Sequence, residues 1–285
     1  MQKETAQVRF LYQTEIGRCL LKILVQPWVS KTADVYLNSR LSRWLVGVYI
    51  RKYNIDLSEF TKNKYRSFND FFTRERSEHN IDASPENLIS PCDSYLTAYR
   101  IDQDSVYKIK HIEYNLEQLL GDAELAKNYA GGVCLIFRLT PRHYHRYCYV
   151  CDGVEESTKR IDGKLHCVRP VAYTSVPVFI QNSREYTVLE SKQLGTVVQM
   201  EVGALLVGKI KNHMNGCRVM QGAEKGYFEF GGSTIIVLLE KDRVDIDGEI
   251  FERSENGVET EVRLGLKIGE VQHKVSCCEE KYEAD

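Results

Sequence analysis

The sequence predicts an α+β protein, in which helices come first and a mainly antiparallel β core follows. Apolar residues recur at helical spacing from Val8 to about Arg51. After about Leu88, short apolar runs are separated by Gly, Asp and Asn turns, a pattern typical of strands. Because the two kinds of segment are separated along the chain, the pattern favours α+β over an alternating α/β architecture. The predicted regions are therefore a helical one at 1–87 and a β-rich one at 88–285.

Two apolar stripes occupy the helical segment, and Pro27 separates them because proline interrupts a helix. Basic and aromatic residues border both stripes, the composition expected of helices that rest in a lipid interface. An ordinary helical pair packed on its own domain would show the same pattern, so both interpretations stay open. The stripes are Ile16, Leu20 and Leu24, then Leu37, Leu41, Leu45 and Val48, and the bordering aromatic residues are Trp28, Trp44 and Tyr49.

Capping boxes at 56–59 and 67–70 predict that two short helices begin there. In the second helix Phe68, Phe71 and Phe72 would share one face, which predicts core packing. Later elements follow from the same periodicities. A helix is predicted over 116–129, and strands are predicted over 134–138, 196–200 and 235–239.

Composition limits the class of protein. The 285 residues suffice for one sizeable domain, and a formal charge of -2 with a pI of about 6.4 argues against a nucleic-acid binder. No apolar run approaches the ~20 residues of a spanning helix, and the first residues lack the pattern of a signal peptide. We therefore expect a cytosolic protein that at most lies on a membrane. Nine irregularly spaced cysteines fit reduced thiols better than a disulfide framework.

A Gly-Ser-Thr step, Gly232-Ser233-Thr234, directly precedes the apolar run 235–239. The carbonyl before Ser233 belongs to glycine, so no side chain blocks attack on it, and glycine tolerates the strained backbone that such an attack needs. Ser233 is therefore a candidate for cutting its own chain. Taken alone, a Gly-Gly pair before a β-branched run more often marks a turn that enters a strand.

Other segments, taken in order along the chain with this step, resemble the phosphatidylserine decarboxylase family. The resemblance runs from about Phe68 to about Asp247, and the helical, aromatic N-terminal part is similar to the shorter bacterial members. The segments are Phe68-Asn69-Asp70-Phe71-Phe72-Thr73-Arg74, Ser90-Pro91-Cys92-Asp93, Tyr144-His145-Arg146, Val202 to Ile210, and Lys225-Gly226-Tyr227-Phe228-Glu229.

The resemblance implies a proenzyme that cleaves itself between Gly232 and Ser233. Ser233 would become a covalent pyruvoyl group at the start of a small chain. This cofactor would be the electron sink of a carboxy-lyase that converts phosphatidylserine to phosphatidylethanolamine and carbon dioxide in phospholipid synthesis. The implied partners are phosphatidylserine in the membrane and the protein's own small chain, with the protein peripheral on the cytoplasmic face of the cell membrane. A homodimer is compatible with the sequence, which does not indicate the oligomeric state.

The resemblance also assigns roles to individual residues. Asp93 matches the family's aspartate of the cleavage machinery. His145 is the retained histidine and our candidate acid for protonating the α carbon after carbon dioxide leaves. Cys148 stands where the family has a second histidine, and His143 where it has an aspartate. The base that activates Ser233 therefore stays open between His145 and the replacement Cys148.

Two further residues enter as alternatives. His166 is a substitute imidazole that the resemblance does not itself support. The resemblance also implies a pocket shaped by the segment of Arg184 and by a strand at 202–210. Arg184 is a candidate for pairing with a substrate carboxylate or phosphate through its planar guanidinium. A surface ion pair with Glu185 or Glu190 is the other interpretation of Arg184.

His143, His145, Cys148 and Cys151 also have the residue types of a zinc site. On a strand the two histidines would share a face while Cys148 begins on the other, so we favour reduced thiols and no metal. The alternative to the enzyme is a non-maturing relative that acts as a lipid- or zinc-binding protein. A denaturing gel separates the two, because only the enzyme yields two chains.

Overall fold

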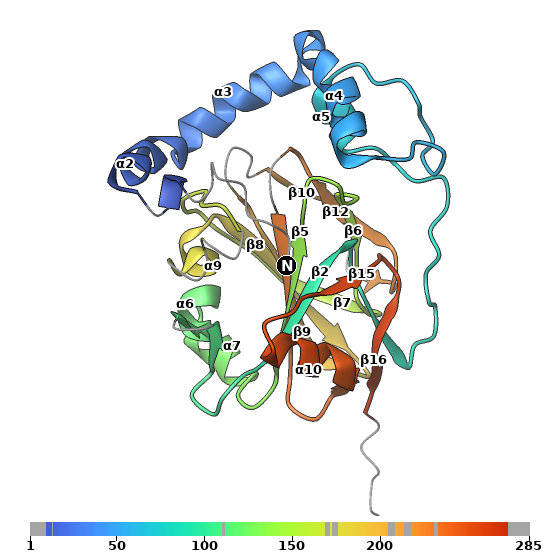
Figure 1. Cartoon of the computed structure of the whole chain (residues 1–285). Coiled ribbons are helices and arrows are strands. Elements are labelled where there is room, and N and C mark those ends of the chain that lie inside the picture. The colour runs from blue at the N-terminus through green and yellow to red at the C-terminus, as the bar shows by residue number, and fades with distance from the viewer. Residues whose placement is uncertain are drawn as a thin grey trace, which may run out of the picture.

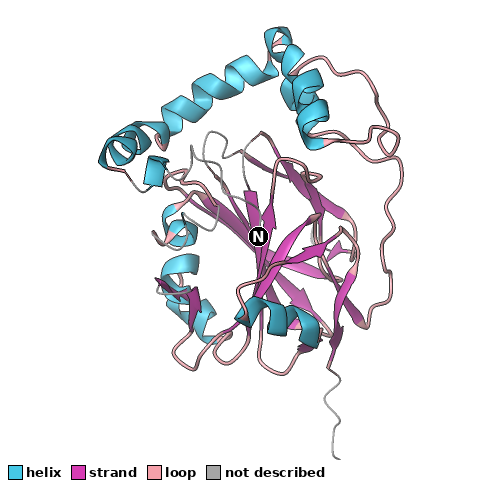
Figure 2. Ribbon diagram, in the orientation of Figure 1, coloured by secondary structure: helices cyan, strands magenta, loops and turns pink. Residues whose placement is uncertain are grey.

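The computed structural model describes residues 10–12, 14–109, 112–168, 172, 176–204, 209–213, 218–230 and 233–272. In this part of the chain the first helices form an arm that lies over one end of a β-rich body (Figure 1). Figure 2 shows the helices of the arm apart from the strands and loops of the body, which follow the arm in sequence. The predicted α+β class with a mainly antiparallel core is confirmed. The division between 87 and 88 stays a prediction.

The helices of the arm begin and end where the sequence supplies caps and breaks. The Thr14 hydroxyl accepts a hydrogen bond from the Gly17 N–H at the start of α2, and Pro27 opens α3. Asn54 adopts the left-handed conformation, with φ of 50°, that ends α4. The elements are α2 (Glu15–Leu24), α3 (Pro27–Asn38), the 3-10 turn η1 (Arg40–Ser42), α4 (Trp44–Tyr53) and α5 (Phe68–Phe72).

Of the two predicted capping boxes, one opens a helix and the other does not. Ser67 Oγ accepts from the Asp70 N–H at 3.2 Å at the start of α5, which confirms that prediction. The prediction of a helix at 56–59 is wrong. Asp56 Oδ1 accepts from the Ser58 N–H at 2.9 Å, and this bond closes a turn that no helix follows before α5.

The apolar side chains of the arm divide between packing and exposure. The core packing predicted for the three phenylalanines of α5 is confirmed, since they form a buried cluster with Leu37 and Tyr65. Other members of the predicted stripes are exposed, among them Ile16 (75%), Leu41 (76%) and the bordering Trp44 (63%). Across the described residues, none of the helices combines the length and the apolar character needed to cross a membrane.

An antiparallel sheet of eight strands forms the centre of the described body. Its order is β11-β7-β8-β9-β13-β5-β2-β15, so β13 lies between β9 and β5. The three predicted strands are confirmed, because they fall within β5, β9 and β13. The strands are β2 (Ser94–Arg100), β5 (Val133–Leu139), β7 (Gly153–Ile161), β8 (Arg184–Ser191), β9 (Gly195–Val202), β11 (Arg218–Val219), β13 (Ser233–Leu239) and β15 (Thr260–Val262).

Both faces of this sheet are covered, which explains why β13 is a continuous apolar run. Alternate side chains of β13 enter two different clusters. Ile235 and Val237 pack with the smaller sheets β1-β16-β14 and β10-β12-β6, whereas Ile236 and Leu238 pack on the side of α6, α7 and α9. The remaining elements are β1 (Asn87–Ile89), β3 (Val106–Ile109), β4 (Ile112–Asn115), β6 (Arg146–Cys148), β10 (Ile210–Asn212), β12 (Glu224–Phe228), β14 (Val244–Ile246), β16 (Lys267–Val271), α6 (Leu116–Leu120), α7 (Ala123–Lys127), α9 (Val178–Gln181) and α10 (Gly248–Glu255).

Two predicted elements are corrected. The single helix at 116–129 is two helices, because Gly121 adopts φ of 60° and ends α6 before Asp122 caps α7. The strand at 202–210 is not continuous, because β9 ends at Val202 and β10 begins only at Ile210. Residues 205–208 lie outside the described part of the chain.

Candidate functional site

Ser233 is the first residue of β13, in the interior of the large sheet. It pairs with Leu139 of β5, and strand alternation turns its side chain toward the same face as Ile235. The residue is 1% exposed, and Oγ has no hydrogen-bond partner among the described residues. Gly232, the predicted other side of the cleavage site, lies outside them. The predicted nucleophile is thus a buried, unpaired hydroxyl at the start of a central strand.

The register across the sheet brings the segment of Asp93 to the same end as Ser233. Tyr95 of β2 pairs with Arg138 of β5, so Ser94 stands beside Leu139, which itself pairs with Ser233. Asp93 directly precedes this row. The predicted aspartate and serine therefore lie at the same end of the sheet, at the starts of β2 and β13, which flank β5.

The Asp93 carboxylate is held by an arginine, not by a histidine. Its oxygens accept from Arg76 Nη1 at 3.1 Å and Nη2 at 2.5 Å, and Oδ1 also accepts from the Leu264 N–H at 2.9 Å. Asp93 is 8% exposed. Sequence reasoning missed Arg76, since no spacing rule links it to a residue 17 positions away. The Asp93 carboxylate therefore joins Arg76 to the backbone at Leu264.

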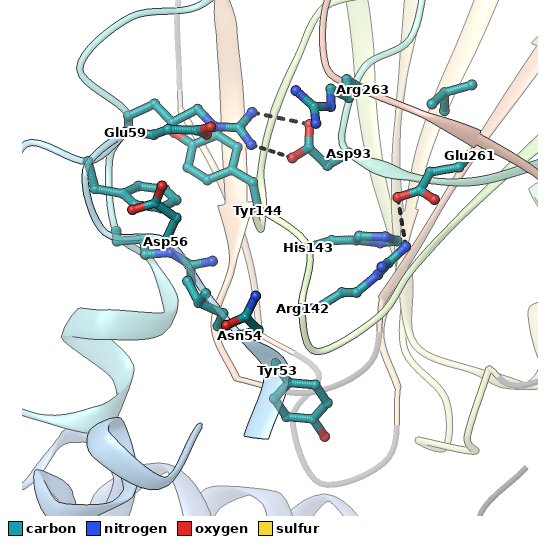
Figure 3. Close-up of a pocket in the computed structure, with 15 residues that line it drawn as sticks. Tyr53, Asn54, Asp56, Glu59, Asp93, Arg142, His143, Tyr144, Glu261 and Arg263 are labelled. Atoms are coloured by element: carbon teal, nitrogen blue, oxygen red, sulfur yellow. Dashed lines mark hydrogen bonds and ion pairs between the residues drawn. The ribbon is translucent and has the colours of Figure 1, made fainter. Parts of the chain in front are cut away.

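His143 is the histidine that shares a pocket with Asp93 (Figure 3). Its Nδ1 accepts from the Thr140 N–H at 3.1 Å, so in the neutral ring the proton is on Nε2, which has no partner in the described chain. Burial, together with the charge of Arg142, lowers the pKa of His143 to about 4, so the ring is neutral at pH 7. Sequence reasoning considered His143 only as a substituted aspartate and a zinc ligand.

His145 is fully buried against α5. Its ring centroid lies 3.8 Å from that of Phe72, and both ring nitrogens lack partners within the described residues. Burial first, and then the nearby positive charge of Arg74, lowers the pKa of His145 well below its ordinary value. A neutral imidazole keeps one nitrogen able to accept a proton. The ring can therefore receive a proton, and the lowered pKa makes it a weaker base than a free imidazole.

Cys148 does not offer such a proton acceptor. Its thiol is buried, with Sγ 4.0 Å from the Ser90 carbonyl oxygen, and burial raises its pKa to about 12. The thiol is therefore protonated at neutral pH and is a poor proton acceptor. Within the described residues, no three His, Cys, Asp or Glu side chains are arranged to hold a metal ion.

The contacts of Arg184 indicate a third role, and its pairing with substrate stays a prediction. The side chain is 4% exposed and donates to the backbone carbonyls of Gln118, Leu119, Ile180 and Asn182 at 2.5–3.0 Å. No described carboxylate forms an ion pair with it, and its donors are turned toward the backbone. Arg184 therefore joins α6 and α9 to the start of β8, which is a structural role.

His166, the substitute imidazole, lies elsewhere. Its Nδ1 is 3.5 Å from the hydroxyl of Tyr12, which belongs to the cluster on the opposite face of the sheet from Ser233. Its backbone N–H donates to Asn182 at 2.9 Å. These contacts give no support to His166 as the base for Ser233.

Helix α5 holds the chain just before the predicted cleavage site. Asn69 Oδ1 accepts from the Phe230 N–H at 3.0 Å, and Asn69 Nδ2 donates to Asn38 at 3.1 Å. The ring of Phe230 meets those of Phe68 and Phe72 edge-on, with centroids 4.9 and 5.2 Å apart. The Phe-Asn-Asp-Phe-Phe segment thus fixes a residue three positions before Ser233.

A pocket of about 250 Å³ lies where the arm meets the body, and Asp93 and His143 form part of its wall (Figure 3). Tyr53 and Asn54, at the end of α4, contribute the arm side. Charged side chains dominate the lining, including Arg142, which is paired with Glu261. The segments of Asp93 and His143 therefore share one highly polar pocket.

Comparison with known proteins assigns this arrangement to a family. The family model for phosphatidylserine decarboxylase matches residues 68–270. The chain belongs to this family. A phosphatidylserine decarboxylase proenzyme 2 from Clostridium acetobutylicum is 45% identical over 94% of this chain and 93% of its own length. Phosphatidylserine decarboxylase proenzymes from Clostridium novyi and Clostridium botulinum are 41% and 37% identical, with at least 91% of each chain covered.

Membership in the phosphatidylserine decarboxylase family confirms the resemblance found in the sequence, including its N-terminal extent to Phe68. The similar proteins named above are proenzymes, the form expected of a chain that is processed. The roles of Asp93, His145 and Ser233 rest on the site geometry and stay predictions.

Proposed function

We propose that the chain is a self-processing proenzyme that cleaves between Gly232 and Ser233, forms a pyruvoyl group from Ser233 and decarboxylates phosphatidylserine to phosphatidylethanolamine. One observation carries the proposal. Six buried polar atoms of the predicted site residues and their neighbours have no partner in the described chain, and each such atom costs about 1–3 kcal/mol. A cluster of this kind is a functional signature. The atoms are Ser94 Oγ, Thr140 Oγ1, His143 Nε2, His145 Nδ1, His145 Nε2 and Ser233 Oγ.

Maturation follows from the chemistry of Ser233. Its Oγ attacks the Gly232 carbonyl carbon, the peptide C–N bond breaks and an ester forms. Loss of the Cα proton then expels the Gly232 carboxylate and leaves dehydroalanine, which takes up water and releases ammonia to give the pyruvoyl group. The buried, unpaired Oγ with glycine before it fits this precursor role. The pyruvoyl group supplies an electron sink for decarboxylation.

The chain's own residues would move the protons. His145 is neutral and has unpaired nitrogens, so it can accept the Ser233 proton and later protonate the substrate α carbon. Cys148, with its pKa near 12, does not compete for the first role. Asp93 and Arg76 fix the loop beside them, so Asp93→Asn should accumulate uncut precursor by loosening that ion pair.

The fold supports a small chain that stays bound after cleavage, and a peripheral membrane location. β13 pairs along its whole length with β5 and over five residues with β9, so cutting before Ser233 leaves the new chain inside the sheet.

The arm exposes apolar side chains such as Leu41 and Trp44, which suit contact with the membrane that holds the substrate. A position on the cytoplasmic face is part of the proposal.

Intact mass measurement tests the proposal. The wild type should give two chains, and the small one should begin with pyruvoyl at position 233 and release carbon dioxide from phosphatidylserine. Ser233→Ala should stay one inactive chain, because the hydroxyl is both the attacking atom and the group that is eliminated. Ser157→Ala, an exposed serine on β7, is the matched control and should mature. Two chains from Ser233→Ala, or an unmodified serine at the cut, would refute the mechanism.

A further inference from the structure

Arg74 is a buried cation without a counter-ion in the described chain. It lines the pocket of Figure 3, is 4% exposed, and forms no ion pair with a described carboxylate. Nη1 donates to the Phe71 carbonyl at 3.3 Å, and Nε has no partner among the described residues. Its guanidinium lies 4.5 Å from the ring centroid of Phe60 and 4.9 Å from that of Phe71. Buried charges are normally paired, so this arrangement calls for an anion from outside.

The other charged groups of the pocket do not supply that anion. Each carboxylate that lines it is either engaged by another arginine or exposed to solvent. Once these pairs are formed, the buried positive charge of Arg74 remains. The pairs are Arg76 with Asp93 and Glu59, and Arg142 with Glu261, while Arg263 and Asp56 are exposed.

We propose that Arg74 binds the phosphodiester of a phospholipid headgroup, so that the pocket holds the headgroup of phosphatidylserine during decarboxylation. This assignment rests on the proposed function. A guanidinium matches phosphate oxygens through parallel N–H donors. Asp93 and His143 line the same pocket, and the positive charge of Arg74 reaches His145, where it helps to lower the pKa. The anion site therefore lies beside Asp93 and within electrostatic reach of His145.

The phosphate fits this position better than the substrate carboxylate does. The carboxylate loses its charge as carbon dioxide leaves, so a fixed cation on it would stabilise the substrate more than the transition state. The phosphate keeps its charge in substrate and product. A cation on the phosphate therefore contributes uniform binding, which appears in KM and not in kcat.

Binding is tested in the uncut Ser233→Ala precursor, where differences in maturation play no part. Titration calorimetry with glycerophosphoserine should show binding that Arg74→Met weakens by about 10-fold or more and that Arg74→Lys partly keeps. Arg160→Met, which removes an exposed arginine paired with Asp162, is the charge-matched control and should bind like the parent. Inorganic phosphate should compete with glycerophosphoserine but bind more weakly. Equal binding by the Arg74→Met and Arg160→Met precursors, or tighter binding of free phosphate, would overturn the headgroup assignment.

Kinetics of the cut enzyme on phosphatidylserine in mixed micelles give an independent readout. Arg74→Met should raise KM by about 10-fold or more and change kcat by less than about 3-fold, whereas Arg160→Met should change neither. An unchanged KM in folded, cut Arg74→Met enzyme would overturn the inference. If the wild type cuts itself but releases no carbon dioxide from phosphatidylserine, the proposed function fails, while the precursor titration still decides whether Arg74 binds the anion.

Discussion

Replacing Asn69 with alanine should slow self-cleavage although Asn69 carries no reacting atom. Its Oδ1 accepts from the backbone N–H of Phe230, three residues before Ser233, and the residue is 4% exposed. The substitution leaves that N–H without its partner. An unpaired donor costs about 1–3 kcal/mol when fully buried, and this N–H is partly buried, so these values are upper bounds. If the whole cost falls on the conformation that presents Gly232 to Ser233, the cleavage rate falls by about 5-fold to 150-fold.

The assay follows uncut and cut chains over time on a denaturing gel after rapid synthesis of the precursor. Asn38→Ala is the matched control, because Asn38 accepts from Asn69 Nδ2 while the Phe230 N–H donates to Asn69 Oδ1. It should cleave within about 2-fold of the wild type, since it leaves the Phe230 hydrogen bond intact. Thermal unfolding in the Ser233→Ala background reports whether Asn69→Ala is folded. Folded Asn69→Ala precursor that cleaves at the wild-type rate would show that α5 does not position the scissile segment.

Three further outcomes are expected. Cys148→Ala should cleave within about 2-fold of the wild-type rate, because a thiol of pKa near 12 is protonated, whereas His145→Ala should stall. If the Cys148→Ala precursor stalls while the His145→Ala precursor matures, the assignment is reversed. The pKa of His143 is lowered to about 4 in the folded chain, so its contribution to stability is complete above the unfolded value of about 6.5 and is lost as the pH falls toward 4, by about 3 kcal/mol. Urea unfolding at several pH values should show a shallower acid loss for His143→Gln, and an identical pH dependence would contradict a neutral buried ring. Combined Leu41→Glu and Trp44→Glu should lower flotation with anionic vesicles by at least about 10-fold, and unchanged flotation would place the membrane contact elsewhere.

The parts of the fold that depend on local sequence could be predicted. The run at 235–239 indicated a strand because both of its faces are buried, and Ser67 indicated the start of α5 because its cap is formed within three residues. The helix at 116–129 was overextended. Apolar spacing continues through Gly121, and only the backbone conformation there shows that the helix ends.

The parts of the site that depend on distant residues could not be predicted in the same way. Ser233 was found because glycine and serine are adjacent in sequence. The engagement of Asp93 by Arg76, and of Arg184 by four carbonyls, depends on loops that meet only in the folded chain. His143 was passed over for a similar reason, because the hydrogen bond that sets its tautomer comes from the turn after β5.

The position of β13 in the interior of the sheet has a consequence for how the protein regains its structure. Before cleavage, every strand belongs to one chain, so folding is a first-order process whose rate does not depend on protein concentration. After the proposed cleavage, β5 and β9 would belong to the larger chain while β13 would begin the smaller one. Recovery from denaturant then requires two molecules to meet, with a rate that rises with concentration. Maturation would thereby turn a reversible folding reaction into an assembly reaction, and the lifetime of the cut enzyme would depend on never fully opening this sheet.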